Sequence, residues 1–283
     1  MKTMLLPQYQ QSQAFMERFL VAAHKAGISI ERCRSDANIQ TIDIKEMSLD
    51  RLDYFVQHKD SFRREFCEDL SEKISRDDFQ LFCEVISNDW FDGKRLRVEG
   101  RSRRLKRSVL DYLKTICQMN SAVESFVQTT DLPTDVEPLI PIQSIAAILA
   151  TNDQMILRHT HEWKKIHSNY DTLSNNDIFL RRGLALDREL STEHLYSEWD
   201  FINSYSIAFT CPEKFSQLVS GNIPAIVNGD IALFDGRVLF FSPFIPDMEV
   251  GQLEFGIIPS DKPLPIRSQG VHSGIYEYLL DPI

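Results

Sequence analysis

The sequence predicts an α+β protein with a helical N-terminal part and a mainly β C-terminal part. Apolar residues recur at helical spacing through much of the first 130 positions. After residue 178, short runs rich in β-branched and aromatic residues alternate with turn residues. Prolines between positions 129 and 141 separate the two patterns, because proline lacks the backbone donor that a helix needs. We therefore expect a helical domain over residues 1–130 and a second domain over residues 142–283.

The first predicted helix follows from an apolar stripe that begins near Ser48. Its members recur mostly every third or fourth residue and would share one helical face: Leu52, Phe55, Val56, Phe62, Phe66, Leu70 and Ile74. Ser75 then resembles the start of a capping box, with Asp78 in the position usually held by Glu, and predicts a second helix. The spacing over residues 105–116 predicts a third.

The second part should open with a helix and continue in strands. Residues 142–167 have helical spacing, and residues 213–219 predict one or two further turns. Five runs predict strands: residues 178–180, 201–209, 225–234, 237–241 and 253–258. Asp235-Gly236 between two of these runs predicts a tight β-hairpin, because both residues tolerate the positive φ angles of such a turn.

The composition is that of a globular protein without a membrane span or a disulfide framework. Of 283 residues, 43% are hydrophobic and 25% are charged. No apolar run reaches the ~20 residues that cross a bilayer. The five cysteines are scattered without a C-x-x-C pair, which indicates reduced thiols. The N-terminus lacks the pattern of a signal peptide, so we expect a cytoplasmic protein, with leaderless secretion left open.

One short segment has a charge opposite to that of the chain. The formal net charge is −10, yet eight basic residues and one acid lie between Lys94 and Arg107. Such a patch can contact phosphate groups, including those of RNA or DNA, or an acidic partner. The alternative is a solvated loop followed by the first turn of a helix, and the sequence alone leaves both open.

Two features of the C-terminal half carry groups suited to nucleotide binding. Arg182-Gly183 follows an apolar run and places a permanent positive charge, able to pair with phosphate oxygens, beside a residue that lets a ligand approach the backbone. Arg181 should point away, because successive side chains of a strand face opposite sides. The same alternation puts the hydroxyls of Ser204 and Ser206 on one face.

A third feature is a carboxylate, for which two positions compete. Gln252-Leu253-Glu254 opens an apolar strand directly, and Asp247-Met248-Glu249 precedes it. We favour Glu254, because a carboxylate at the start of a strand can face the same cleft as the arginine. Glu249 stays the alternative.

In this order, the arginine, the Ser-x-Ser pair, the following Phe215 and the Gln-x-Glu motif resemble the ADP-ribosyltransferase family. The resemblance covers residues 142–283 and departs from the family pattern at Tyr205, where threonine is usual, and at Pro259, one residue late. It implies a fold in which two small sheets are split around an NAD cleft.

The resemblance also implies how NAD would be bound. Arg182 would anchor the phosphates of NAD, and Gly183 would let the cofactor approach the backbone. Ser204 and Ser206 would shape the pocket of the nicotinamide ribose, with Phe215 packed near the cofactor.

The chemistry implied by the resemblance centres on the carboxylate. Glu254, or Glu249, would hydrogen-bond the ribose and stabilise positive charge on it as nicotinamide leaves, and Gln252 would orient the acceptor. We expect no metal, because His159, His161 and His167 are not spaced to close a site on one helix face.

Two functions are compatible with these features. The first is an NAD-dependent mono-ADP-ribosyltransferase, in the glycosyltransferase class, which acts as a toxin or effector on a protein or nucleic-acid acceptor. The alternative is a non-enzymatic interaction protein with a degenerate transferase-like scaffold, because a fold can lose its catalysis.

Overall fold

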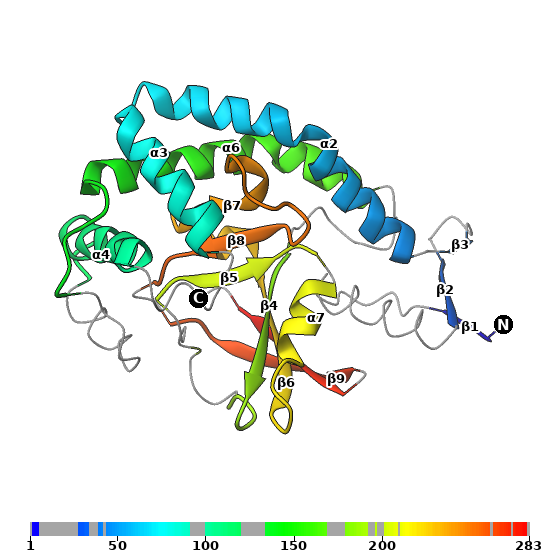
Figure 1. The fold of residues 1–283 in the computed structure, drawn as a ribbon. Coiled ribbons are helices and arrows are strands. Elements are labelled where there is room, and N and C mark those ends of the chain that lie inside the picture. Colours follow the sequence, from blue (N-terminus) through cyan, green and yellow to red (C-terminus); the bar gives the residue numbers. More distant parts are fainter. Residues whose placement is uncertain are drawn as a thin grey trace.

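The computed structural model describes residues 2–5, 28–33, 39–41, 44–90, 100–119, 134–168, 179–191, 196, 201–208, 210–260, 263–272 and 274–281. The two longest helices, α2 (Ile44–Ser71) and α6 (Ile142–Ser168), lie side by side in a layer over one end of the sheet (Figure 1). The shorter helical segments are α3 (Arg76–Glu84), η1 (Val85–Trp90), α4 (Gly100–Thr115), α7 (Thr210–Ser216), η4 (Ile231–Phe234) and η5 (Ser242–Phe244). The predicted α+β class is confirmed.

Two helices begin at the positions that the sequence predicts. The backbone N–H of Asp78 donates to Ser75 Oγ at 3.1 Å, which confirms the predicted cap of α3. α6 covers the predicted helix of residues 142–167 and extends it by one residue. No helix among the described residues is both long enough and apolar enough to cross a membrane.

Strands of the C-terminal half form one seven-stranded sheet in the order β7-β8-β5-β4-β6-β10-β9. Their bounds are β4 (Phe179–Leu186), β5 (Asn203–Ser206), β6 (Ile223–Asp230), β7 (Val238–Phe241), β8 (Glu254–Ile257), β9 (Ile266–His272) and β10 (Ile275–Leu280). The last two strands were not predicted from the sequence.

The sheet differs from the split pair of sheets that the family resemblance implied. β4 pairs with β6 at eight positions but with β5 at one, where Arg181 lies opposite Ser206. In Figure 1, β5 and β8 run across the direction of β4 and β6, so the sheet turns sharply at that single pair. The expectation of two separate sheets is wrong for the described residues, because this pair keeps the hydrogen-bonded ladder continuous.

The hairpin predicted at Asp235-Gly236 is also wrong. β6 pairs with β4 and β10, whereas β7 pairs with β8 at the far edge of the sheet. Asp230 explains the difference, because its side chain accepts a hydrogen bond from Ala232 N at 2.8 Å and starts η4. η4 ends the strand before the turn, so the turn leads into a different part of the sheet.

The N-terminal part was predicted to be helical throughout, but it also contains strands. β1 (Lys2–Leu5), β2 (Ile28–Cys33) and β3 (Ile39–Thr41) form a three-stranded sheet before α2. The sequence signal was the alternation of apolar and polar residues from Ile28 to Glu31, which has the period of a strand.

The helical layer and the sheet share one apolar core. Phe55 of α2 meets Phe241 of β7 edge-to-face, with ring centroids 5.2 Å apart. The amide of Asn152 on α6 donates to the carbonyl oxygen of Leu239 on β7 at 2.9 Å. Arg63 of α2 donates to the carbonyl oxygen of Met248, so α2 also holds the loop that leads to β8. The division into domains at residues 130 and 142 stays a prediction.

We predict that Asp153→Asn stabilises the protein more at pH 8 than at pH 5. Burial on α6 and, to a smaller extent, the nearby Asp235 carboxylate raise the pKa of the Asp153 carboxyl, a hydrogen bond from the backbone of Gly236 lowers it, and the resulting pKa is about 7. Because the pKa is higher than in the unfolded chain, the stability that this group contributes is present at acid pH and is lost as pH rises through about 7. The asparagine side chain of the variant does not ionise and therefore avoids this loss of stability. We put the loss at about 1 kcal/mol of the free energy of unfolding, because the site is partly solvated. Denaturant unfolding at both pH values measures it.

Asp135→Asn is the matched control, because the Asp135 carboxylate pairs with Arg103 at the surface (3.0 Å). It should change the free energy of unfolding little between pH 5 and pH 8. If Asp153→Asn had the same pH profile as the unaltered chain, the account of Asp153 would be wrong.

Candidate active site

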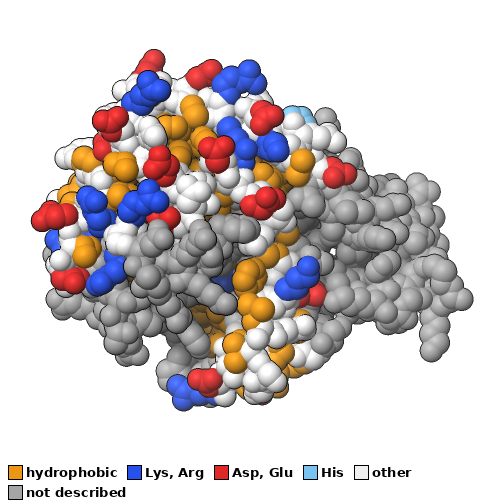
Figure 2. Space-filling view, in the orientation of Figure 1, with side chains coloured by type: hydrophobic (Ala, Val, Ile, Leu, Met, Phe, Trp, Pro, Cys, Tyr) orange, Lys and Arg blue, Asp and Glu red, His pale blue; other side chains and the backbone are white. Residues whose placement is uncertain are grey.

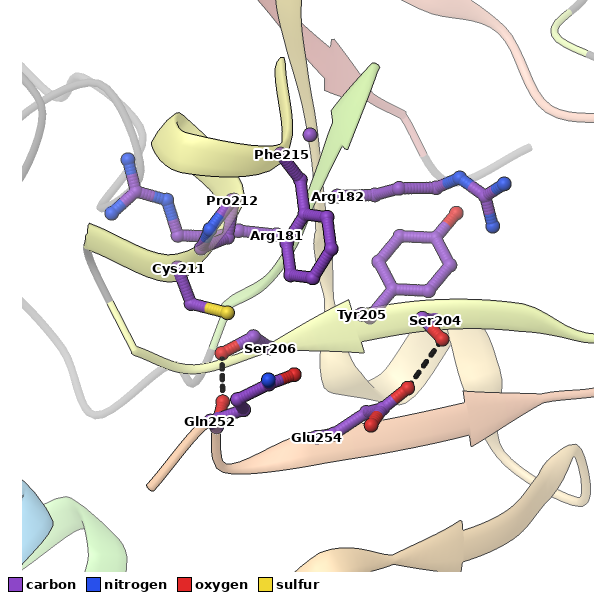
Figure 3. A pocket seen from close by; sticks show the side chains of 11 residues that line it. Arg181, Arg182, Ser204, Tyr205, Ser206, Cys211, Pro212, Phe215, Gln252 and Glu254 are labelled. Atoms are coloured by element: carbon purple, nitrogen blue, oxygen red, sulfur yellow. Dashed lines mark hydrogen bonds between the residues drawn. The ribbon is translucent and has the colours of Figure 1, made fainter. Parts of the chain in front are cut away.

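A cavity of about 230 Å³ lies where β4, β5, α7 and the start of β8 meet (Figure 3). Its wall is formed by Arg181, Arg182, Gly183, Ser204, Tyr205, Ser206, Cys211, Pro212, Phe215, Gln252 and Glu254. Hydrophobic side chains gather over the part of the surface that α7 occupies (Figure 2). The predicted site residues other than Glu249 thus lie around one cavity, and their roles stay predictions.

The two candidate carboxylates lie in different surroundings. Glu254 begins β8, is 8% exposed, and accepts a hydrogen bond from the Ser204 hydroxyl (Figure 3). Its backbone N–H donates to Ser242 Oγ at 3.0 Å. Glu249 is exposed, and its Oε1 accepts from the backbone N–H of Gly251 at 3.4 Å. Glu254 is therefore the carboxylate in the cavity wall, and Glu249 lies outside it.

The chain enters β8 through a strained turn. Leu253 has a φ of 45°, in the left-handed region that side chains disfavour by about 1–2 kcal/mol. Its N–H donates to the carbonyl oxygen of Val250 at 2.9 Å. The Ser206 hydroxyl donates to the carbonyl oxygen of Gln252 at 2.6 Å. These contacts tie the turn to β5 at the point where Gln252 and Glu254 join the cavity wall.

Arg181 lies on the same face of the sheet as Glu254. It is opposite Ser206 across β4 and β5, and Ser206 is opposite Glu254 across β5 and β8. Residues directly opposite on antiparallel strands have side chains on the same face, with Cβ atoms ~5 Å apart. The prediction that Arg181 points away is therefore wrong. The register in which β4 pairs with β5 determines which arginine shares the sheet face with Glu254, and this register could not be predicted from the sequence.

The guanidinium of Arg182 lies on the other face. Its Nη1 donates a short hydrogen bond to Asn203 Oδ1, and its Cζ lies 5.9 Å from the centroid of the Tyr205 ring. Asn203 and Tyr205 alternate with Ser204 and Ser206 along β5, so they face away from Glu254. Figure 3 shows the side chains of Arg181 and Arg182 extending in opposite directions.

Gly183 serves the packing of α7 on β4, which the sequence analysis did not foresee. A Cβ atom at Gly183 would lie 1.9 Å from the carbonyl oxygen of Pro212 and 2.9 Å from the backbone nitrogen of Ser216. The backbone of α7 therefore occupies the space that a side chain at Gly183 would need, and the role of Gly183 in NAD binding stays a prediction. Because it packs so closely, α7 brings Cys211 and Phe215 into the cavity wall.

We predict that Gly183→Ala lowers the free energy of unfolding by about 3 kcal/mol, because the added methyl group must push the backbone of α7 off β4. Gly100→Ala is the control, since a Cβ atom there meets no atom within 4 Å. Denaturant unfolding compares the two. Equal stability of both variants would show that α7 does not pack as described.

The part of the wall that comes from α7 is apolar. The Phe215 side chain is 46% exposed and lies over the cavity in Figure 3. Burial and, to a smaller extent, the nearby Glu254 carboxylate raise the pKa of the Cys211 thiol, Lys214 lowers it, and the resulting pKa is about 11. The thiol is therefore neutral at neutral pH and acts as an apolar lining group. A flat ring could pack on Phe215 here.

Two residues behind the cavity were missed by the sequence analysis. Asn228 and Glu277 are buried and contact Arg181 from β6 and β10. Glu277 stands in the run from Ile275 to Leu280, which is otherwise apolar or aromatic. An acidic residue in such a run was the signal that could have indicated a buried functional carboxylate.

The described arginines of the basic segment contact other parts of the chain. Arg101 pairs with Glu84 and Asp89 at 3.3 and 3.2 Å. Arg107 pairs with Asp111 at 2.9 Å and donates to the carbonyl oxygen of Thr134 at 2.8 Å. These contacts favour a structural role on α4 for these two arginines, and residues 94–99 lie outside the described ranges.

Within the described ranges, no three or more His, Cys, Asp or Glu side chains come together to hold a metal ion. His159 Nε2 lies 3.1 Å from Glu65 Oε2, between α6 and α2. The side chains of His161 and His167 lie outside the described part of the chain.

No model of a known protein family matches this chain, and no curated protein sequence matches it. Among solved structures, the chain is similar to a crystal structure of the ADP-ribosyltransferase Vis in complex with an inhibitor called M6. The two share 12% sequence identity and a TM-score of 0.38, over 86% of each chain. A likeness at this level does not assign the chain to a family.

Proposed function

We propose that this chain is an NAD-dependent mono-ADP-ribosyltransferase of the toxin or effector type. The observation that carries the proposal is the contact between Ser204 and Glu254 in the wall of a cavity that is also lined by Phe215. These residues come from β5, β8 and α7, and together they offer an oriented carboxylate beside an exposed aromatic ring.

The reaction breaks the bond between the nicotinamide nitrogen and the ribose, and the electron pair of that bond leaves with nicotinamide. Positive charge develops on the ribose until a nucleophile of the acceptor bonds to the same carbon and gives up its proton to water. Glu254 supplies negative charge where this positive charge develops, which is worth about 10²–10³ in rate for one such contact. The Ser204 hydroxyl holds the carboxylate in place.

The size of the cavity indicates which end of NAD it would take. A volume of about 230 Å³ is below the ~300–1,000 Å³ of pockets that enclose a whole drug-sized ligand. The cavity would therefore hold the nicotinamide end, with the ring packed on Phe215. Apolar and aromatic lining favours a flat, weakly polar ring over a phosphate.

We assign the phosphate contact to Arg181 and keep Arg182 as the competing candidate. Arg181 shares the face of the sheet with Ser206 and Glu254, whereas Arg182 bonds Asn203 on the other face. A guanidinium can donate two parallel hydrogen bonds to phosphate oxygens. Gln252, partly exposed in the cavity wall, would orient the acceptor.

Incubation of the chain with NAD labelled in the adenylate, with and without a cell lysate, tests the proposal. We expect release of nicotinamide and transfer of label to a macromolecule. Digestion of the labelled product with protease or nuclease then identifies the acceptor as protein or nucleic acid. If neither nicotinamide release nor transfer occurs, the chain is not a transferase and the non-enzymatic alternative stands.

A further inference from the structure

A buried ion pair lies beside the cavity, in the strands next to it. Arg181 on β4 is 0% exposed, and Asn228 on β6 and Glu277 on β10 are each 1% exposed. Arg181 Nε donates to Asn228 Oδ1 at 3.3 Å, and Asn228 Nδ2 donates to Glu277 Oε2 at 2.6 Å. Arg181 Nη2 lies 3.8 Å from Glu277 Oε1. Asn228 therefore bridges the two charged groups and holds them in one arrangement.

Stability alone does not account for these charges. Taking an ion out of water costs several kcal/mol, and well-packed apolar residues in place of a buried ion pair often give equal or greater stability. Apolar residues are accommodated at the neighbouring positions of the same strands, because Ile226 and Leu279 are buried there. Charged groups buried next to a cavity are candidates for a functional role.

Of the three residues Arg181, Asn228 and Glu277, Arg181 connects the buried ion pair to the cavity. Arg181 is in the cavity wall and lies opposite Ser206, which lies opposite Glu254. Glu277 is outside the wall but in ionic contact with Arg181. A change at Glu277 would thus reach a ligand through the position of one guanidinium.

We propose that Glu277 is a positioning residue for substrate binding. Together with Asn228 it holds the buried side chain of Arg181 in one arrangement beside the cavity, and Arg181 is the residue to which the proposed function assigns the phosphates of NAD. The inference rests on the proposed function, since it takes NAD as the ligand. It makes β10 part of the substrate site, although the resemblance assigned no role to this strand.

A double-mutant cycle of Glu277→Gln and Arg181→Lys on the full chain tests the inference. The dissociation constant of NAD is measured by calorimetry for each variant. Glu277→Gln keeps the volume of the side chain and an acceptor for Asn228 but removes the charge. We expect it to weaken NAD binding about tenfold, and to weaken it less than about twofold when Arg181→Lys is already present. In steady-state nicotinamide release, KM should rise more than kcat falls. Additive effects of the two substitutions would overturn the inference.

Asn152→Ala controls for loss of stability, because Asn152 is buried, bonds the carbonyl oxygens of Ile148 and Leu239, and lies outside the cavity wall. It should leave NAD affinity unchanged. If Glu277→Gln does not fold, Glu277→Asp replaces it, and unchanged NAD affinity in the folded variant overturns the inference. If the unaltered chain binds no NAD, the proposed function fails, and this inference fails with it.

Discussion

Glu254→Gln is expected to lower the rate of nicotinamide release from NAD by about 10²–10³ while leaving NAD affinity within about threefold. The amide keeps the size of the side chain and can still accept a hydrogen bond from Ser204, the partner of Glu254 in the cavity. It lacks the negative charge that stabilises the developing positive charge on the ribose. Initial rates give the first quantity, and calorimetry with NAD gives the second.

Glu249→Gln is the matched control, because Glu249 is exposed and lies outside the cavity wall. It should release nicotinamide at the rate of the unaltered chain. Were the loss to follow Glu249 and not Glu254, the catalytic carboxylate would lie in the other of the two sequence motifs.

Arg181→Lys is expected to weaken NAD binding by about 10- to 100-fold. Lysine keeps the positive charge but loses the planar fork that binds two phosphate oxygens at once. The ammonium group also cannot reproduce the contacts of Arg181 with Asn228 and Glu277 together. The NAD dissociation constant, measured by calorimetry on variants with a verified unfolding transition, gives the result.

Arg182→Lys provides the comparison at the adjacent position. The Arg182 guanidinium bonds Asn203 and lies over the Tyr205 ring on the other face, so NAD affinity should change less than about threefold. A larger loss for Arg182→Lys than for Arg181→Lys would return the phosphate contact to Arg182.

Features set by neighbours in the sequence were predicted well. The cap of α3 depends on Ser75 and Asp78, and α6 depends on the spacing of apolar residues over residues 142–167. Gln252, Glu254, Ser204 and Ser206 were singled out as a group, and all four lie around one cavity. Their proximity could be proposed from the sequence only through the family resemblance.

Features set by long-range pairing were not predictable from one sequence. Whether Arg181 or Arg182 faces Glu254 depends on a single pair between β4 and β5. A shift of one residue there would exchange the two arginines, and nothing in the local sequence sets it. Likewise Asp235-Gly236 has the local chemistry of a hairpin, but Asp230 ends β6 early and the strands separate.

The sequence also gave no reason to connect Glu277 with Arg181. The two residues lie on β10 and β4, and they meet because β6 lies between these strands and carries Asn228. The order of strands in a sheet depends on the packing of the whole domain. A contact between side chains on β4 and β10 therefore cannot be predicted from the sequence near either residue.

The central claim is that the cavity between β5, α7 and β8 binds the nicotinamide end of NAD. A crystal structure of the Glu254→Gln variant, soaked with NAD, tests it most directly because turnover is slowed. We predict the nicotinamide ring against Phe215, with the ribose beside residue 254. NAD bound elsewhere on the chain would contradict the claim. A cavity that contains no density for nicotinamide at saturating NAD would also contradict it.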